Sequence, residues 1–201
     1  MKSSLLLVLL LILVAPSQIA GQNIQVAWEQ SYTAEASGDY SRAIQVLVSN
    51  GDKGYMTLLR LGYLNYMAGQ HVESMRYYQQ CINLMPYAIE PRLGYVNPAA
   101  AVNNWADVRK QYEEILKIDP KQTLVMYRMG LMHYNLGEYP KALGYFEKVA
   151  NLYPADYDTL LMYGWTQLQL GKKNEAKVLF EKVLLLKPKD ESALQGLSLI
   201  R

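Results

Sequence analysis

Residues 126–154 read MYRMGLMHYNLGEYPKALGYFEKVANLYP, and residues 160–188 read LLMYGWTQLQLGKKNEAKVLFEKVLLLKP. Six positions carry the same kind of residue in both segments: a bulky residue, a glycine, an alanine, a phenylalanine, a valine and a proline. The two sets are Met126, Gly130, Ala142, Phe146, Val149 and Pro154, and Leu160, Gly164, Ala176, Phe180, Val183 and Pro188. Each member lies 34 positions after its counterpart. Such a period indicates a repeated helix-turn-helix unit.

This pattern resembles the tetratricopeptide repeat, which has a bulky residue, a small residue, alanine, an aromatic residue and a closing proline. The resemblance implies an all-α fold, a right-handed α-solenoid of tetratricopeptide helix-turn-helix repeats with a C-terminal capping helix. The glycines and alanines would let two helices approach closely, and the aromatic ring would fill the gap to the next pair. The proline would end the second helix, because the residue before a proline avoids helical angles.

Steps of the same period extend the pattern towards the N-terminus. They give full repeats at 55–88, 89–122, 123–156 and 157–190, with a capping helix at 191–201 that carries an amphipathic pattern. The repeat at 89–122 is degenerate, because Pro98 falls inside its first helix; we expect that helix to be kinked or delayed. A truncated repeat at 24–54 precedes these. Its spacing from Ala43 to Gly62 is 19, against 22 from Ala142 to Gly164, so about three residues are missing.

Composition narrows the classes of function. The chain has 201 residues, enough for one or two domains, and 51% of them are hydrophobic. The formal net charge of +2 predicts no general attraction to nucleic acid. Cys81 is the only cysteine, so no disulfide forms within the chain, and we expect a buried, inert thiol. The 17 tyrosines suit half-exposed surfaces, although many of them would simply pack between repeat helices.

The N-terminus has the pattern of a secretory signal peptide at residues 1–21. Lys2 precedes an apolar run at 5–15, and small residues follow it. The two best cleavage sites are after Ser17 and after Gly21, and an uncleaved anchor is the alternative. The run is short for a membrane span, which needs about 20 residues. We therefore expect an exported protein, periplasmic or secreted and of bacterial type, with no integral membrane span after cleavage.

No catalytic pattern emerges. His71 and His133 are separated by more than one repeat and do not have the spacing of metal ligands. The sequence contains no phosphate-binding loop and no nucleophile motif. We expect no enzyme activity, no cofactor, no metal and no nucleic-acid partner. The function predicted instead is that of a scaffold or adaptor in the cell envelope.

In tetratricopeptide proteins the inner faces of the first helices line a groove, and the resemblance carries that role to particular positions here. The expected groove binds a protein or peptide, with aromatic rings supplying area and arginines anchoring carboxylates. Its predicted residues are Trp28, Tyr32, Arg60, Tyr63, Tyr66, Asn97, Tyr127, Arg128, Leu131, Tyr134, Asn135, Trp165 and Gln169. Tyr66 and Tyr134 could alternatively pack against the adjoining repeat.

The resemblance covers about residues 24–190, and two other functions stay open beside the adaptor. One is self-association into a homo-oligomer, with Trp28 and the short first repeat stacking on another copy. The other is an accessory subunit of an envelope enzyme, or a glycan binder, because aromatic rings also stack on sugars. The Lys–Asn–Asn clamp of chaperone-binding members is not matched, since Leu59, Tyr63 and Met67 stand where it would start.

Overall fold

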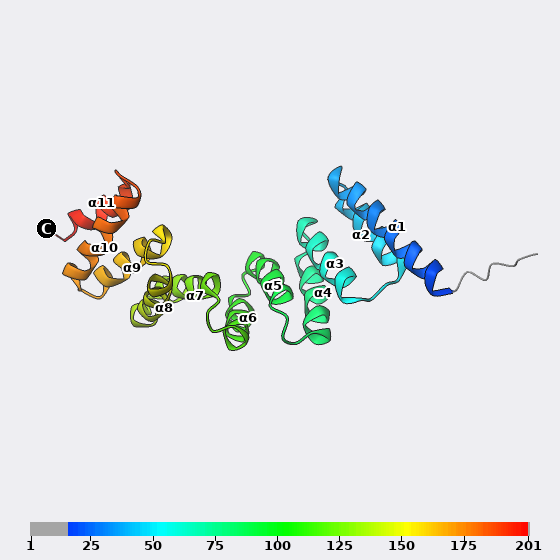
Figure 1. Ribbon diagram of the computed structural model, residues 1–201, viewed down its shortest axis with the longest axis horizontal. Helices are drawn as coiled ribbons and strands as arrows, with labels where there is room; N and C mark the ends of the chain where they lie inside the picture. The colour runs from blue at the N-terminus through cyan, green and yellow to red at the C-terminus, as the bar shows by residue number, and fades with distance from the viewer. Residues whose placement is uncertain (1–15, 201) are drawn as a thin grey trace, which may run out of the picture. The chain divides into compact units, whose positions relative to one another are not determined.

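The computed structural model describes residues 16–200, and the regular elements within them are helices, which confirms the expected all-α fold. The helices are α1 (Pro16–Ala36), α2 (Tyr40–Asn50), α3 (Tyr55–Met67), α4 (His71–Leu84), α5 (Glu90–Ala101), α6 (Trp105–Ile118), α7 (Thr123–Asn135), α8 (Tyr139–Leu152), α9 (Tyr157–Gln169), α10 (Lys173–Leu186) and α11 (Glu191–Ser198). Figure 1 shows them in chain order.

The chain divides into two compact units. Unit 1 ends at Val102 and includes α1–α5, and unit 2 begins at Asn103 and includes α6–α11. Within each unit, every helix packs against the next one along the chain. First helices also contact one another, since α3 touches α5, α7 touches α9, and α9 touches α11. The division falls inside the predicted repeat at 89–122, between its two helices.

Prolines end the second helices as the pattern predicts. Helices α4, α6, α8 and α10 each stop two residues before a proline. The residue that precedes the proline has left the helical region, with φ and ψ of −133° and 80° at Met85 and of −135° and 88° at Lys187. The proline ring disfavours helical angles at the preceding residue, so each hairpin ends at a fixed register.

In each unit, one aromatic ring on a second helix lies against two glycines on neighbouring helices. A Cβ atom placed on Gly62 of α3 would lie 2.8 Å from the Tyr78 ring, and one placed on Gly94 of α5 would lie 2.4 Å from it. In unit 2, Phe180 contacts Gly164 of α9 and Gly196 of α11 in the same way. These contacts confirm that the small residues permit close helix approach and that the ring fills the gap to the next first helix. The second glycine of each pair was not predicted.

Gly130 and Gly144 provide a matched test of this packing in unit 2. A Cβ on Gly130 would lie 2.6 Å from the buried Phe146 ring, whereas one on Gly144, in α8, would meet nothing within 4 Å. We expect Gly130→Ala to destabilise the protein by about 1–3 kcal/mol through overpacking. Gly144→Ala should stabilise it by roughly 0.5–1 kcal/mol, because alanine loses less backbone entropy in a helix. Urea denaturation should show shifts of opposite sign, and equal shifts would contradict the assigned packing.

The first hairpin is shorter than the others. Helix α2 has 11 residues, whereas α4, α6, α8 and α10 have 14 each. Asp39 caps its start by accepting a hydrogen bond from the Arg42 amide at 2.9 Å. Gly51 ends it in the left-handed region, with φ of 79°. This shortening is the one that the spacing from Ala43 to Gly62 implies.

The first helix in repeat 89–122 was expected to be kinked or delayed; the delay is wrong, and the kink stays a prediction. Helix α5 begins at Glu90, with Pro91 in its first turn, and continues through Pro98 to Ala101. Pro91 lies where the amide would have no partner within the helix in any case. Pro98 lies near the other end, so it removes one hydrogen bond from the last turns instead of breaking the helix in the middle.

Helix α11 is the predicted capping helix, and Asp190 fastens it to unit 2. The Asp190 carboxylate accepts hydrogen bonds from the Tyr157 hydroxyl at 2.6 Å and from the Ala193 amide at 2.9 Å. Lys187 lies 3.0 Å from the same side chain. The Tyr157 hydroxyl, followed by the Ala193 amide, lowers the pKa of Asp190 from 3.8 to about 2.

The lowered pKa predicts an acid dependence. Asp190 keeps its charge in the folded state below the pH at which it is protonated in the unfolded chain. Its contribution to stability is therefore fully present above about pH 4 and is lost as the pH falls towards 2. Tyr157→Phe removes the largest cause, so urea denaturation of this variant at several pH values should show a smaller acid-induced loss. Tyr153→Phe, at an exposed ring, is the control. Equal losses in all three proteins would contradict this assignment.

Residues 1–15 lie outside the described residues, so most of the predicted signal peptide does as well, and residues 16–21 begin α1. In the part of the chain that is described, no helix combines the length and apolarity that a membrane span requires. The Cys81 thiol is buried as expected, and burial raises its pKa to about 11. At neutral pH it is therefore protonated and a poor nucleophile.

Candidate functional site

The first helices of unit 1 line a pocket of about 350 Å³, here called the unit 1 pocket. Helices α1, α3, α4 and α5 all contribute to it. Its lining residues are Trp28, Tyr32, Met56, Leu59, Arg60, Tyr63, Tyr78, Glu90 and Gly94. The structure thus brings together four of the predicted groove residues, Trp28, Tyr32, Arg60 and Tyr63, beside the Glu90 carboxylate.

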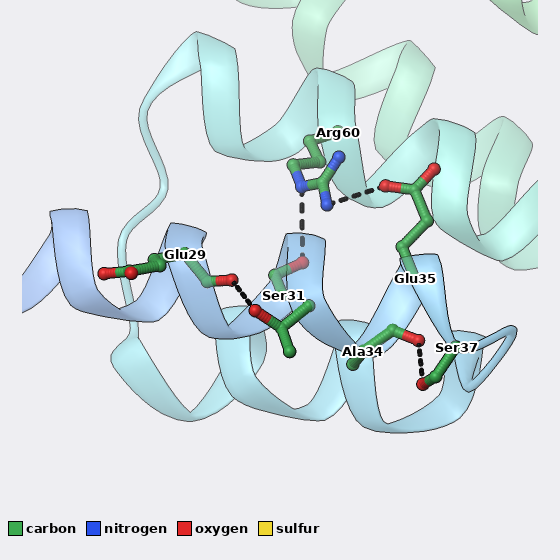
Figure 2. Close-up of polar contacts among 7 residues, drawn as sticks. Glu29, Ser31, Ala34, Glu35, Ser37 and Arg60 are labelled. Carbon is green, nitrogen blue, oxygen red and sulfur yellow. Dashed lines mark hydrogen bonds and ion pairs between the residues drawn. The ribbon is translucent and has the colours of Figure 1, made fainter.

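Arg60 is held inside the protein by partners from α1 (Figure 2). Its Nε donates to Ser31 Oγ at 3.2 Å, and its Nη2 donates to Glu35 Oε2 at 2.9 Å. The guanidinium carbon also lies 3.6 Å from the centroid of the Tyr32 ring. Arg60 is only 8% exposed, and Glu35 neutralises its charge. This corrects the expectation that Arg60 anchors a carboxylate of the ligand.

The rings of the unit 1 pocket are fixed by the same set of contacts. Partial burial, followed by the effect of the nearby Glu35 carboxylate, raises the pKa of Tyr63. Trp28 Nε1 donates to Thr57 Oγ1 at 3.3 Å. Even so, Tyr32 is 53% exposed and Tyr63 is 40% exposed. The pocket therefore presents aromatic surface that is already ordered before a ligand arrives.

The first helices of unit 2 line a second pocket, of about 600 Å³, called the unit 2 pocket. It is formed by α7, by the end of α8 and by the start of α9. Its lining residues are Thr123, Leu124, Tyr127, Arg128, Leu131, Val149, Tyr153, Asp156, Asp158 and Thr159. Three predicted residues, Tyr127, Arg128 and Leu131, meet in it.

The arginine of the unit 2 pocket, unlike Arg60, is not neutralised by a carboxylate within residues 16–200. Arg128 is exposed and, among the described residues, forms no ion pair. Asp156 caps α9 by accepting from the Thr159 amide at 2.9 Å. Burial raises the pKa of Tyr127, and the Asp158 and Asp156 carboxylates raise it further. Both carboxylates thus disfavour ionisation of the Tyr127 hydroxyl.

The other predicted groove residues lie outside these two pockets. Tyr66 faces the His71 ring at 5.7 Å between centroids, and Tyr134 packs edge-on against Tyr139 at 5.4 Å. Asn97, Asn135 and Gln169 are exposed. Both ring contacts are made inside a single repeat, so packing of Tyr66 and Tyr134 against the adjoining repeat stays a prediction.

The Trp165 side chain contacts the capping helix α11. Its Nε1 donates to Ser192 Oγ at 2.9 Å, and its ring meets Phe180 edge-on at 5.3 Å between centroids. Replacing Trp165 would therefore disturb the end of unit 2 as well as any ligand, so it is a poor test residue for binding.

Several pocket residues were missed by sequence reasoning, among them Glu90, Tyr153, Asp156, Asp158 and Thr159. They lie at the ends of helices, whereas the groove was predicted from the middle of each first helix. One signal was visible: an aspartate before a helix, followed two residues later by a second acid, is typical of a helix start. It places both carboxylates where the chain leaves α8 and enters α9.

Both histidines pack against aromatic rings. His133 Nδ1 lies 2.6 Å from Glu138 Oε2, and its ring stacks on Tyr145 with centroids 5.5 Å apart. His71 lies against Tyr66. Across residues 16–200, no group of three or more His, Cys, Asp or Glu side chains is placed to hold a metal ion.

Comparison with known proteins supports the repeat assignment. Residues 56–86 and 134–199 each match a model described as "Tetratricopeptide repeat". Anaphase-promoting complex subunit 6 of Arabidopsis thaliana is 26% identical over 172 residues, which are 82% of this chain and 31% of that protein. The chain thus spans about a third of that relative's length.

Two solved structures have the same fold. A tetratricopeptide repeat protein from Parabacteroides merdae superposes with a TM-score of 0.76 at 19% identity, covering 90% of this chain and 73% of the other. A structure of the MamA protein gives 0.71 at 18% identity, with 85% and 95% covered. At these identities the likeness concerns the fold alone. The chain therefore contains tetratricopeptide repeats, and the helical hairpins of both units are of that type.

Proposed function

We propose that the protein is a non-catalytic adaptor that binds a segment of another protein on the first helices of its hairpins. The observation that carries this proposal is the pair of pockets built from α1 and α3 in unit 1 and from α7 and α9 in unit 2. In both, an aromatic ring, an arginine and a carboxylate line one concave surface. Tyrosine and tryptophan are among the residue types that concentrate in protein interfaces.

The order of the unit 1 pocket favours binding. Tyr32 stacks on Arg60 and Trp28 donates a hydrogen bond to Thr57, so contacts within the protein hold two of the rings in place. Side chains that are already immobilised lose little rotamer freedom when a partner docks. Tyrosine also gives large contact area with only two side-chain torsions to restrain.

We place this activity outside the cytoplasm, in a cell envelope. The support is Lys2, the apolar run at 5–15 and the small residues after it. Mass spectrometry of the protein recovered from its host should find a mature N-terminus at Gln18 or Gln22. A chain that starts at Met1 would rule out cleavage.

Site-specific photo-crosslinking in the host cell tests the binding function. A benzophenone amino acid is introduced at Tyr63 or Leu124, one in each pocket, and at Val72 or Leu185, which are exposed on second helices. We expect the pocket positions to crosslink one identifiable partner and the control positions to leave it uncaptured. Equal crosslinking from all four positions, or from none, would refute binding on the first helices.

A further inference from the structure

Two buried threonines at the same repeat position have different surroundings. Thr57 and Thr159 lie 102 positions apart, which is three periods of 34, and each is the third residue of a first helix. Both are only 1% exposed. Thr57 Oγ1 accepts a hydrogen bond from the indole of Trp28, whereas Thr159 Oγ1 is buried without a partner among the described residues. A buried hydroxyl that lacks a partner loses the free energy of hydration without compensation.

The difference arises from the preceding hairpin. Gly38 and Gly137 mark the same turn, 99 positions apart, so Tyr127 corresponds to Trp28. The Tyr127 ring packs against Phe146, with centroids 5.8 Å apart. A phenol has no N–H in its ring, and Thr159 lines the unit 2 pocket. In unit 1, a planar N–H donor satisfies the threonine hydroxyl. In unit 2, the equivalent hydroxyl has no such donor in the described part of the chain and lies beside the unit 2 pocket.

The charges of the unit 2 pocket specify the donor further. Asp156 and Asp158 oppose the single guanidinium of Arg128, so the lining carries one negative charge in excess. Within the described residues, Asp158 has no ion-pair partner. Asp156 uses one oxygen for the helix cap and keeps further acceptor sites. A cationic ligand is therefore favoured, and Tyr127 and Tyr153 offer ring surface to the rest of its side chain.

We propose that the unit 2 pocket binds an arginine side chain of the partner polypeptide, with Asp158 as the counter-ion and the Thr159 hydroxyl as one acceptor. The inference rests on the proposed function and deepens it, because it names the chemistry that unit 2 recognises. Arginine suits the site because its guanidinium is planar, permanently charged and carries five N–H donors. Arg128 then opposes binding instead of anchoring it.

Fluorescence anisotropy with the purified full chain tests this inference. The probe is a fluorescein-labelled peptide of alternating alanine and arginine, compared with peptides in which citrulline or glutamate replaces arginine. Citrulline keeps the shape and removes the charge. We expect the arginine peptide to bind roughly tenfold more tightly than the citrulline peptide and the glutamate peptide to bind most weakly.

Variants separate the roles of the lining residues. Asp158→Asn should weaken binding of the arginine peptide roughly fivefold, and Arg128→Gln should tighten it by roughly threefold, because it removes a like charge. Thr159→Val should weaken binding roughly threefold without lowering the urea midpoint, since valine removes an unsatisfied hydroxyl. Thr57→Val, the matched control in unit 1, should lower the urea midpoint and leave arginine-peptide binding unchanged.

The outcomes that overturn the inference are distinct from those that overturn the proposed function. Preferential binding of the glutamate peptide, lost in Arg128→Gln, would show that the pocket holds a carboxylate. An equal weakening by Glu147→Gln, at an exposed acid on α8, would show diffuse attraction without a site. If none of the peptides binds while Leu124 still crosslinks a partner, the arginine assignment fails and the adaptor function stands.

Discussion

Replacing Phe146 by alanine is expected to lower the free energy of unfolding by about 3–5 kcal/mol, which is the usual range for a fully buried phenylalanine. Phe146 has no exposed surface, lies against Gly130 of α7 and meets the Tyr127 ring at 5.8 Å between centroids. The change removes apolar surface from the core and leaves a cavity that rigid neighbouring helices cannot close. Urea denaturation followed by circular dichroism measures the loss.

Leu152→Ala is the control for this prediction. Leu152 lies on the same helix, α8, but is 48% exposed. Its replacement should change stability by less than about 1 kcal/mol, because about half of this residue already contacts water. If Phe146→Ala cost no more than Leu152→Ala, the ring would not fill the gap between α7 and α8, and the assigned repeat register would be wrong.

Replacing Glu35 by alanine is expected to destabilise unit 1 by about 3 kcal/mol, at the lower end of the cost of breaking a buried ion pair. The change leaves the buried guanidinium of Arg60 with only Ser31 and the ring faces of Tyr32 and Trp28. Removing one partner costs more than the pair contributes, since an uncompensated charge stays in the protein. Urea denaturation followed by circular dichroism measures the loss.

Glu73→Ala provides the matched comparison, because Glu73 pairs with Arg76 on the surface of α4. The two side chains are 44% and 52% exposed, so solvent screens the pair and its loss should cost under about 1 kcal/mol. Similar losses in Glu35→Ala and Glu73→Ala would mean that Arg60 is hydrated in solution. The order of Tyr32 and Tyr63 would then need another source.

The sequence contained enough to predict the hairpins and their register. A period of 34, with a proline after the second helix of each full repeat, fixes where Met85 and Lys187 leave the helix, and it pairs Gly62 with Tyr78. These are local rules repeated several times, so an error in one copy is corrected by the others. The rule for Pro98 had no such support, and the delayed start that it allowed is absent, because α5 begins at Glu90.

The chemistry of the candidate site depends on contacts between repeats, which periodicity does not specify. Arg60 and Arg128 occupy one matching position, yet Glu35 neutralises only Arg60. Glu35 lies in the truncated hairpin, where the period is broken, so no equivalent partner could be inferred for Arg128. Gly94 likewise falls short of a full period after Gly62, and its contact with Tyr78 became visible only in the structure.

The ring that separates two glycines also sets a distance. Tyr78 fits between Gly62 and Gly94, and Phe180 fits between Gly164 and Gly196, with no side chain on either glycine to add width. Helices α3 and α5, and likewise α9 and α11, therefore cannot move closer together at these points without displacing a rigid ring. We therefore expect the first helices at these two places to keep their spacing when a partner docks, so the partner has to fit the surface that they already present.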